Sequence, residues 1–444
     1  MSSEGRLFCP ASSPVAPLVD GLAWLWRLGL RLESPAPTAV GVGDAADAAE
    51  LDALVRARQL SGAVILAAGA HGEAGPMPAR YIRSGVARLG GVRVEGVHTL
   101  FADGHAVVRS SLGTHAVRRG NVLVLGADPA LWGRLDLFWA LETVASFLVE
   151  RLERPLVLLP PVGCLRLDDF PGTAELQLRG DARGDRRQRR RAETLIARLE
   201  SERARLIVAV AAQALDRDAE VPLDRVWPDA VTALASGVER GVLEPACHGL
   251  LHLNPHARAS GRVDPREFAG LDVGEAGLRL DAACAWLRTH VGEPRSFVAP
   301  AWGYGPGVLA AAAARELPTW LPAAPGPLLN GFALHETLAI GLPGLHRIDY
   351  APLRRLAELG LPPIVVFHGQ LVDDRIPRLR ATRDVATAGL LALLPDLPRI
   401  ARLSGVRWVG VPELLELLRA HGSIEVAGSE VQAPAAGAVR FFRG

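Results

Sequence analysis

The sequence predicts an α/β protein in two successive parts, an N-terminal parallel α/β layer followed by an irregular (β/α) barrel. From about residue 38 onwards, short apolar runs alternate with segments of helical periodicity, which is typical of parallel α/β structure. After Pro155, several apolar runs stop at polar, chemically capable residues. Strands behave in this way at the carboxyl end of a parallel barrel, where the following loops open onto one face.

Length and composition narrow the classes of protein that this chain can be. Its 444 residues, 49% of them hydrophobic, exceed one ordinary core and predict at least two domains. All 49 basic residues are arginine, which excludes Walker-type phosphate loops and Schiff-base enzymes because both need lysine. The net charge of +1 creates no field that would recruit nucleic acid or an anionic membrane surface. We therefore expect neither partner.

Cysteine usage and the N-terminus indicate where the protein works. The four cysteines include no C-x-x-C pair, which argues against a disulfide framework and a zinc ribbon. The N-terminus lacks the basic-then-apolar order of a signal peptide, and no uninterrupted apolar run is long enough for a membrane span. We expect a cytoplasmic protein. The sequence carries no signal for its oligomeric state.

Residues 1–153 are predicted to form the N-terminal α/β domain. Strands are expected at 38–43, 62–69 and 121–126, and helices at 47–60 and 131–152. This spacing resembles a flavodoxin-like or glutaminase-like layer. No cysteine lies between Cys9 and Cys164, so a thiol nucleophile is not available there. A complete G-x-G-x-x-G dinucleotide motif is also absent after Gly41. We expect this domain to be non-catalytic.

Residues 154–422 are predicted to form the barrel, and residues 423–444 a C-terminal extension. Four apolar runs, at 162–169, 241–248, 295–303 and 363–369, each end in residues with catalytic potential. Helices are expected between and after them, at 187–203, 275–290, 307–315 and 412–420. The arrangement predicts that these strand ends converge on one site.

His248 and His252 form an H-x-x-x-H pair. On one helical turn, residues four apart share a face, so both imidazoles could bind one metal ion. Such a pair also occurs by chance, and two surface or capping histidines are the alternative.

Asp168 and Asp169 end the first barrel-like strand. Adjacent carboxylates at an apolar strand end repel each other and lose hydration unless a cation or proton relieves them. Because the backbone turns at a strand end, one carboxylate can bind a metal while its neighbour faces a reacting water. A solvated turn is the alternative interpretation.

The four strand ends together resemble a known family. Leu167-Asp-Asp, His248-x-x-x-His252, Ala299-Pro-Ala-Trp-Gly and Val366-Phe-His are similar, in order, to the first, second, third and fifth motifs of the polysaccharide deacetylase (NodB-like carbohydrate esterase) family. The resemblance covers roughly residues 155–420. It implies a general base at Asp168 and a general acid at His368, with a divalent metal, Zn²⁺ expected and other divalent ions as alternatives. The implied metal ligands are Asp169, His248 and His252, and the implied substrate contacts are Phe170, Pro300, Trp302 and Tyr304.

The sequence also departs from the family pattern. The third motif carries an arginine that orients the base, whereas this chain has Val298 at that position. Arg166 or Arg347 could supply the missing cation. Phe170 and Pro171 replace the glycine that follows the two aspartates, which would reshape the groove wall. The fourth motif has only Asp349 and Tyr350 as candidates.

The resemblance implies a metal-dependent hydrolase that removes an acetyl or other N-acyl group from an amino sugar, a glycan or a related acetylated compound. Two alternatives remain at this stage. A catalytically inactive, carbohydrate-binding barrel is favoured by Val298 but disfavoured by retention of the carboxylates and histidines. A glycoside hydrolase would use paired carboxylates but leave the H-x-x-x-H pair unexplained. Cys247 and His256 are further candidate ligands that we consider weaker.

Overall fold

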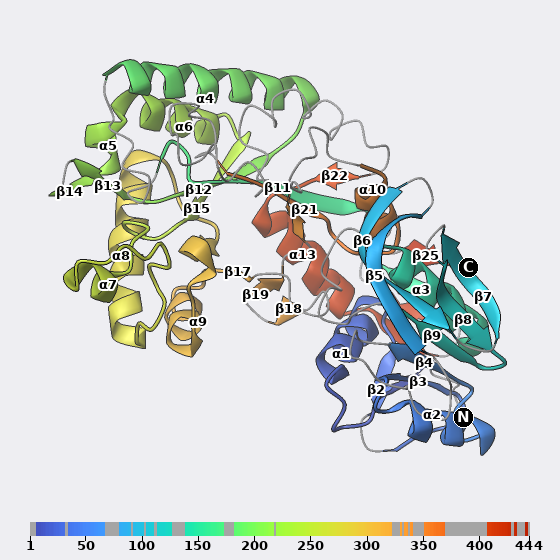
Figure 1. The fold of residues 1–444 in the computed structure, drawn as a ribbon. Helices are drawn as coiled ribbons and strands as arrows, with labels where there is room; N and C mark the ends of the chain where they lie inside the picture. The colour runs from blue at the N-terminus through green and yellow to red at the C-terminus, as the bar shows by residue number, and fades with distance from the viewer. Residues whose placement is uncertain are drawn as a thin grey trace.

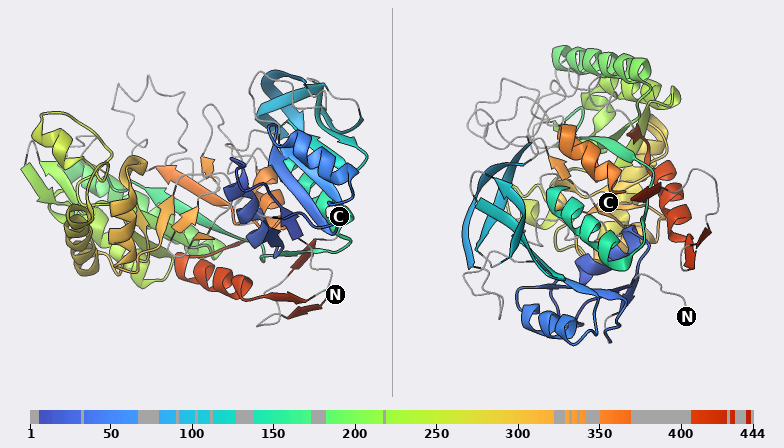
Figure 2. Two further views of the ribbon diagram at one scale, coloured as in Figure 1. Left: turned by 90° about the horizontal axis from the view of Figure 1, so that it is seen from below. Right: turned by 90° about the vertical axis from the view of Figure 1, so that its right-hand side faces the viewer.

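The computed structural model describes most of the chain. The described segments are residues 6–31, 34–66, 80–89, 92–101, 104–110, 113–126, 138–172, 182–216, 219–321, 329–330, 333–335, 338–340, 350–368, 406–427, 430–432 and 440–442. Within these segments the chain forms two large sheets with helices (Figure 1). The N-terminal sheet lies at one end of an elongated molecule (Figure 2).

The N-terminal sheet is mixed. Its strands run in the order β2 (Gly29–Arg31), β1 (Arg6–Phe8), β3 (Ala39–Asp44), β4 (Gly62–Leu66), β9 (Val122–Leu125), β8 (Gly113–Arg119) and β7 (His105–Ser110). The first five strands are parallel, as predicted, whereas β8 and β7 are antiparallel additions. β5 (Arg80–Leu89) and β6 (Val92–Phe101) form a separate antiparallel pair. The expected purely parallel layer is therefore correct only for part of the sheet.

Three helices belong to this half of the chain. They are α1 (Ala16–Leu25), α2 (Ala48–Arg56) and α3 (Phe138–Leu152). α2 ends earlier than predicted, because Arg58 has a left-handed backbone with a φ of 58°, which a continuing helix does not allow.

The second sheet carries the predicted site. Its strands run in the order β18 (Leu329–Asn330), β19 (Ala333–His335), β17 (Thr319–Leu321), β16 (Phe297–Val298), β15 (Leu243–Cys247), β12 (Leu206–Val210), β11 (Val162–Asp168), β21 (Ile364–His368) and β20 (Leu338–Ile340). β22 (Arg407–Trp408) also pairs with β11. All pairs except β18–β19 are parallel. Among the described strands no pairing joins β18 to β20, so a closed barrel is not seen there.

All four strands predicted from apolar runs are present, as β11, β15, β16 and β21. The predicted helices are present too, as α4 (Ala182–Glu202), α8 (Val273–His290), α9 (Pro306–Ala313) and α13 (Val411–Gly422). Further elements are α5 (Leu223–Val226), α6 (Pro228–Glu239), α7 (Pro255–Ala259) and α10 (Tyr350–Glu358), with short strands β10 (Leu156–Leu158), β13 (Gln213–Asp216), β14 (Ala219–Pro222), β23 (Glu425–Ala427), β24 (Glu430–Gln432) and β25 (Arg440–Phe442). No helix of the described residues is both long and apolar enough to span a membrane.

Side chains alternate between two cores along the strands of the second sheet. Leu165 and Leu167 of β11 pack in one core with α4, α6 and α8, whereas Val162 and Cys164 face the opposite core. This alternation is the expected period of two along a strand. Arg166 and Asp168 follow the same spacing as Val162 and Cys164. They therefore lie on the face of the sheet opposite to α4, α6 and α8.

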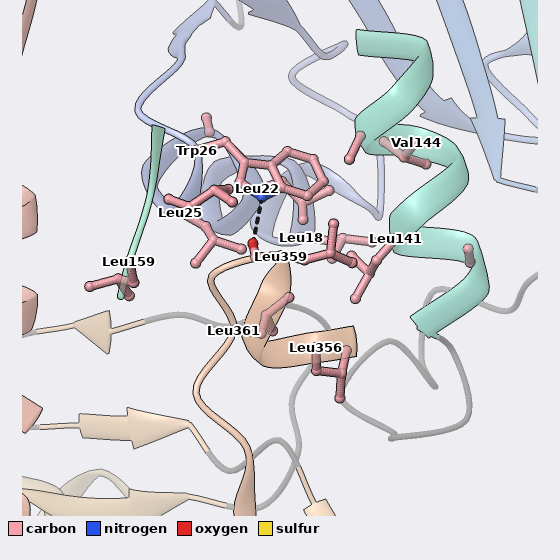
Figure 3. Close-up of a cluster of buried hydrophobic side chains, with 14 of the residues drawn as sticks. Leu18, Leu22, Leu25, Trp26, Leu141, Val144, Leu159, Leu356, Leu359 and Leu361 are labelled. Carbon is pink, nitrogen blue, oxygen red and sulfur yellow. Dashed lines mark hydrogen bonds between the residues drawn. The ribbon is translucent and has the colours of Figure 1, made fainter. Parts of the chain in front are cut away.

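The core that contains Val162 and Cys164 also includes side chains from the N-terminal half of the chain. Leu22 of α1, Trp26 directly after α1 and Leu141 of α3 belong to one buried cluster (Figure 3). The same cluster contains Leu159 and Leu361, which precede β11 and β21. The Trp26 indole N–H donates to the carbonyl oxygen of Leu359 at 3.1 Å. The N-terminal helices thus cover the amino ends of the central strands, and the carboxyl ends remain for the site.

Candidate metal centre

The predicted site residues lie at the carboxyl ends of neighbouring strands. Asp168 is the last residue of β11, His248 follows β15, and His368 is the last residue of β21. β11 and β21 are paired so that Asp168 and His368 are direct partners in the register. Because parallel strands end at the same edge of a sheet, residues far apart in the sequence meet here.

Asp169 lies at the centre of the cluster. Its backbone has a φ of 63°, a left-handed conformation that aspartate tolerates better than most residues. Because of this turn, the side chains of Asp168 and Asp169 point in different directions and contact different partners. Asp169 Oδ1 lies 2.9 Å from His248 Nε2 and 3.2 Å from His252 Nε2. All three side chains are buried, and their donor atoms lie within 4.8 Å of one another.

The hydrogen bond made by His248 Nδ1 determines whether Nε2, the nitrogen that faces Asp169, carries a proton. His248 Nδ1 lies 2.9 Å from the carbonyl oxygen of Val298, and a carbonyl can only accept, so Nδ1 carries the proton. In a neutral imidazole, Nε2 is then a lone-pair donor directed at a carboxylate oxygen. Two such atoms 2.9 Å apart repel unless a proton or a cation lies between them. This arrangement, ring N–H to carbonyl and lone pair inwards, is typical of metal-binding histidine.

The charge and dimensions of the cluster suit a divalent cation. Burial raises the pKa of Asp169, but positive charge on the two histidines lowers it well below its usual value. With neutral imidazoles, a divalent cation between them and the carboxylate would supply that charge. Two ligands bound at about 2.0–2.1 Å to a tetrahedral zinc ion lie about 3.3 Å apart, which is close to the two separations from Asp169. One aspartate and two histidines also leave a coordination position open. The residues present therefore fit the metal that the sequence predicted.

Asp168 is held by a buried arginine on its own strand. Arg166 donates from Nε to Asp168 Oδ1 at 2.8 Å and from a terminal nitrogen to Oδ2 at 2.9 Å. Arg166 is 0% exposed and its guanidinium lies over the Trp320 ring, 5.3 Å from the centroid. Residues two apart on a strand share a face, which explains the pairing. Of the two arginines proposed to replace the third-motif cation, Arg166 is in place, whereas Arg347 lies outside the described residues.

The candidate substrate contacts separate into two groups. Trp302 is 39% exposed and Tyr304 is partly exposed, and both lie on the loop after β16. Phe170 is 1% exposed and packs in the hydrophobic core, and Pro300 is buried as well. Both residues are as buried as the candidate ligands, and their contact with substrate stays a prediction. The chain turns back into the core directly after Asp169.

One expectation about the histidine segment was wrong. Residues 248–252 are not helical, so the two imidazoles do not meet through a helical turn. They meet because the loop bends at Gly249 and His252, which have φ values of 81° and 61°. The weaker candidate ligands lie elsewhere: Cys247 is in the core, and His256 is paired with Glu275 at 3.3 Å. Asp349 is outside the described residues, as are the side chains of Tyr350 and His368.

One residue near the histidines was not predicted. Glu267 is fully buried and accepts hydrogen bonds from the backbone of the 250–252 segment. It lies in the polar stretch Asp264-Pro-Arg-Glu, which carries no periodicity and no short motif. A glutamate in such a stretch is usually solvated, so no sequence signal marked it.

No protein-family profile and no curated protein matches this chain, but solved structures do. A protein from Mycobacterium smegmatis described as a polysaccharide deacetylase is 14% identical, with a TM-score of 0.39, over 64% of this chain and 98% of its own length. The Xyl-CE4 domain of a multidomain xylanase from a Trinervitermes trinervoides hindgut metagenome is 12% identical, with a TM-score of 0.33, over 60% and 97%.

A CE4 family pseudoenzyme from Bacillus anthracis is also 12% identical, with a TM-score of 0.34, over 58% of this chain and 66% of its own. The matching structures belong to the carbohydrate esterase 4 and polysaccharide deacetylase family. This is the family that the four sequence motifs resemble. At these identities and TM-scores the likeness carries no argument about what this chain does. The chemistry of this chain is inferred from its own residues.

Proposed function

We propose that this protein is a divalent-metal-dependent deacetylase that hydrolyses the N-acetyl group of an amino sugar, a glycan or a related acetylated compound. The observation that carries the proposal is the convergence of Asp169, His248 and His252 next to the Asp168–Arg166 pair. A divalent ion held by these three ligands would act as a Lewis acid towards an acyl carbonyl oxygen.

The residues around the ligands have complementary roles. Asp168 is the general base that takes a proton from the attacking water, and the two hydrogen bonds from Arg166 fix its orientation. His368, the register partner of Asp168, protonates the leaving amine, since imidazole is the side chain that exchanges protons near neutral pH. Water and the amide thus yield acetate and a free amine. Trp302 and Tyr304 offer aromatic faces on which a sugar ring can stack.

The Arg166–Asp168 pair weakens the argument for an inactive carbohydrate-binding protein. That alternative rested on Val298 in place of the third-motif arginine. Arg166 binds both oxygens of Asp168, so the proposed base still has an arginine beside it. That arginine comes from β11 and not from the third motif. A glycoside hydrolase is less well supported, because such enzymes place their carboxylates on opposite sides of the glycosidic bond, whereas Asp168 and Asp169 are adjacent.

The proposal is tested by measuring acetate release from acetylated chitooligosaccharides and acetylated xylan. We expect release by zinc-loaded protein, loss after chelation and recovery after zinc is restored. Asp168→Asn should retain the metal but lose turnover by about 10²–10⁴-fold, since general base catalysis contributes that much. A protein that binds zinc but releases no acetate from any acetylated glycan would instead be a binding protein.

A further inference from the structure

The segment that carries the two histidine ligands is shaped by a buried carboxylate. Glu267 Oε1 accepts the backbone N–H of Leu250 at 3.0 Å, and Oε2 accepts those of Leu251 at 3.0 Å and His252 at 2.6 Å. Three successive N–H groups directed at one anion form a concave anion site of the kind that backbone nests make. Since residues 248–252 lack helical hydrogen bonding, this carboxylate replaces it.

A partly buried arginine holds the carboxylate in place. Arg279 of α8 donates from Nε to Glu267 Oε1 at 2.7 Å, and the Glu267 side chain is 0% exposed. Charge-assisted hydrogen bonds of this kind are about twice as strong as neutral ones. Glu267 therefore links the histidine segment to the rigid helix α8.

The segment is fitted to Glu267 at both ends. A Cβ atom at Gly249 would lie 2.4 Å from Glu267 Oε2, and the φ of Gly249 is 81°, so both space and backbone conformation require glycine there. Beyond the segment, Asn254 Nδ2 donates to the carbonyl oxygen of Glu267 at 3.4 Å and to that of Ala269 at 2.8 Å. These contacts leave His252 little freedom, because its own N–H makes the shortest of the three bonds to Glu267.

We propose that Glu267, held by Arg279, is a positioning residue that sets the metal affinity of the site by orienting His252. This inference rests on the proposed function, in which His252 is a metal ligand. Glu267 does not contact the reacting atoms in this scheme. Its contribution is to keep the second imidazole within binding distance before the ion arrives, as residues behind metal ligands generally do.

The test compares zinc dissociation constants, measured by competition with a chromogenic chelator, with melting temperatures of the metal-free proteins. Glu267→Gln loses the charge and one of its two acceptor oxygens, and we expect about 10–100-fold weaker zinc binding, the usual effect of removing a partner behind a ligand. Glu244→Gln is the matched control, since Glu244 is also a buried carboxylate that accepts a backbone N–H, from Val411 at 2.8 Å. It should lower the melting temperature without changing zinc affinity.

Different failures have different meanings. If the unaltered protein binds zinc and Glu267→Gln binds it equally well, the positioning role is refuted and the proposed function stands. If the unaltered protein binds no divalent ion, both are refuted. Should Glu267→Gln fail to fold, Arg279→Met provides the same comparison. It removes the ion pair that holds Glu267 but leaves the Glu267 carboxylate in place. Weaker zinc binding by Arg279→Met supports the proposal, and unchanged binding overturns it.

Discussion

His421 makes the stability of this protein depend on pH. It lies on α13, is 0% exposed, and donates from Nε2 to the carbonyl oxygen of Leu25 at 2.9 Å. Its ring also packs edge-on against Trp24, with 5.3 Å between the centroids. Burial, aided by the positive charge of Arg27, lowers the pKa of His421 from 6.5 to about 4. Acidification therefore acts on the contact between the N-terminal half and the last long helix.

The sign and size of the effect follow from linkage. Because the folded state resists protonation of His421, the unfolded state binds more protons between the two pKa values, and stability falls as the pH drops. His421 contributes its full stability above pH 6.5 and loses it progressively towards pH 4. The expected loss is about 1.4 kcal/mol at about pH 5.5 and about 2.5 kcal/mol at about pH 4.5, relative to neutral pH.

Two measurements check this prediction. Deuterium exchange at the imidazole C2 position, followed by mass spectrometry, reports the pKa of His421 directly. Urea unfolding of the protein and of His421→Gln gives the difference in free energy of unfolding at each pH. Glutamine keeps a donor for Leu25 but does not titrate, so other acidic groups cancel from the difference. The advantage of histidine should shrink by about 2.5 kcal/mol between neutral pH and about pH 4.5.

A measured pKa of 6 or higher for His421 would refute the reasoning. So would a difference between the two proteins that stays constant with pH. Either result would mean that the ring reaches water or an acceptor before the protein unfolds.

Other predictions concern the site and the shared core. Arg166→Met should destabilise the protein by about 3–5 kcal/mol, because it leaves the buried Asp168 carboxylate without its cation; denaturant unfolding checks this, and a double variant that also carries Asp168→Leu should regain much of the loss. Asp169→Asn should abolish stoichiometric zinc binding, as measured by elemental analysis of dialysed protein, and full zinc occupancy would contradict its role as a ligand. Trp302→Ala should raise KM by about 2–10-fold with little change in kcat, since an aromatic stacking contact contributes about 0.5–1.5 kcal/mol. Deletion of residues 1–153 should give insoluble protein, because it strips α1 and α3 from the amino ends of the central strands; a monomeric, cooperatively unfolding fragment would show that residues 154–444 fold alone.

Local patterns in the sequence located four of the ten strands of the second sheet. The runs that became β11, β15, β16 and β21 were recognisable because each is apolar and ends in polar residues. The strand β12 lies between two of them, yet it was not predicted because it carries no chemically distinctive residue at its end. The antiparallel strands β5 to β8 were also missed, since their pairing depends on partners that periodicity does not identify.

For the site, too, the sequence identified the residues but not the backbone conformation that brings them together. Residue type and spacing were enough to select Asp168, Asp169, His248 and His252, because few other groupings of carboxylates and imidazoles follow apolar runs in this chain. The helical explanation for the histidine pair was wrong. Spacing alone does not reveal a loop whose conformation is determined by Glu267, fifteen residues further along the chain from His252.

Residue type and local pattern identify the side chains that are able to bind a metal or transfer a proton, and the apolar runs that carry them. The tertiary structure decided which of these residues meet. It selected Arg166 as the cation at Asp168, placed Phe170 in the core, and joined the two halves through Trp26. The physical reason is that burial and ion pairing depend on contacts between distant segments. Chemical identity and local periodicity belong to each residue and its neighbours.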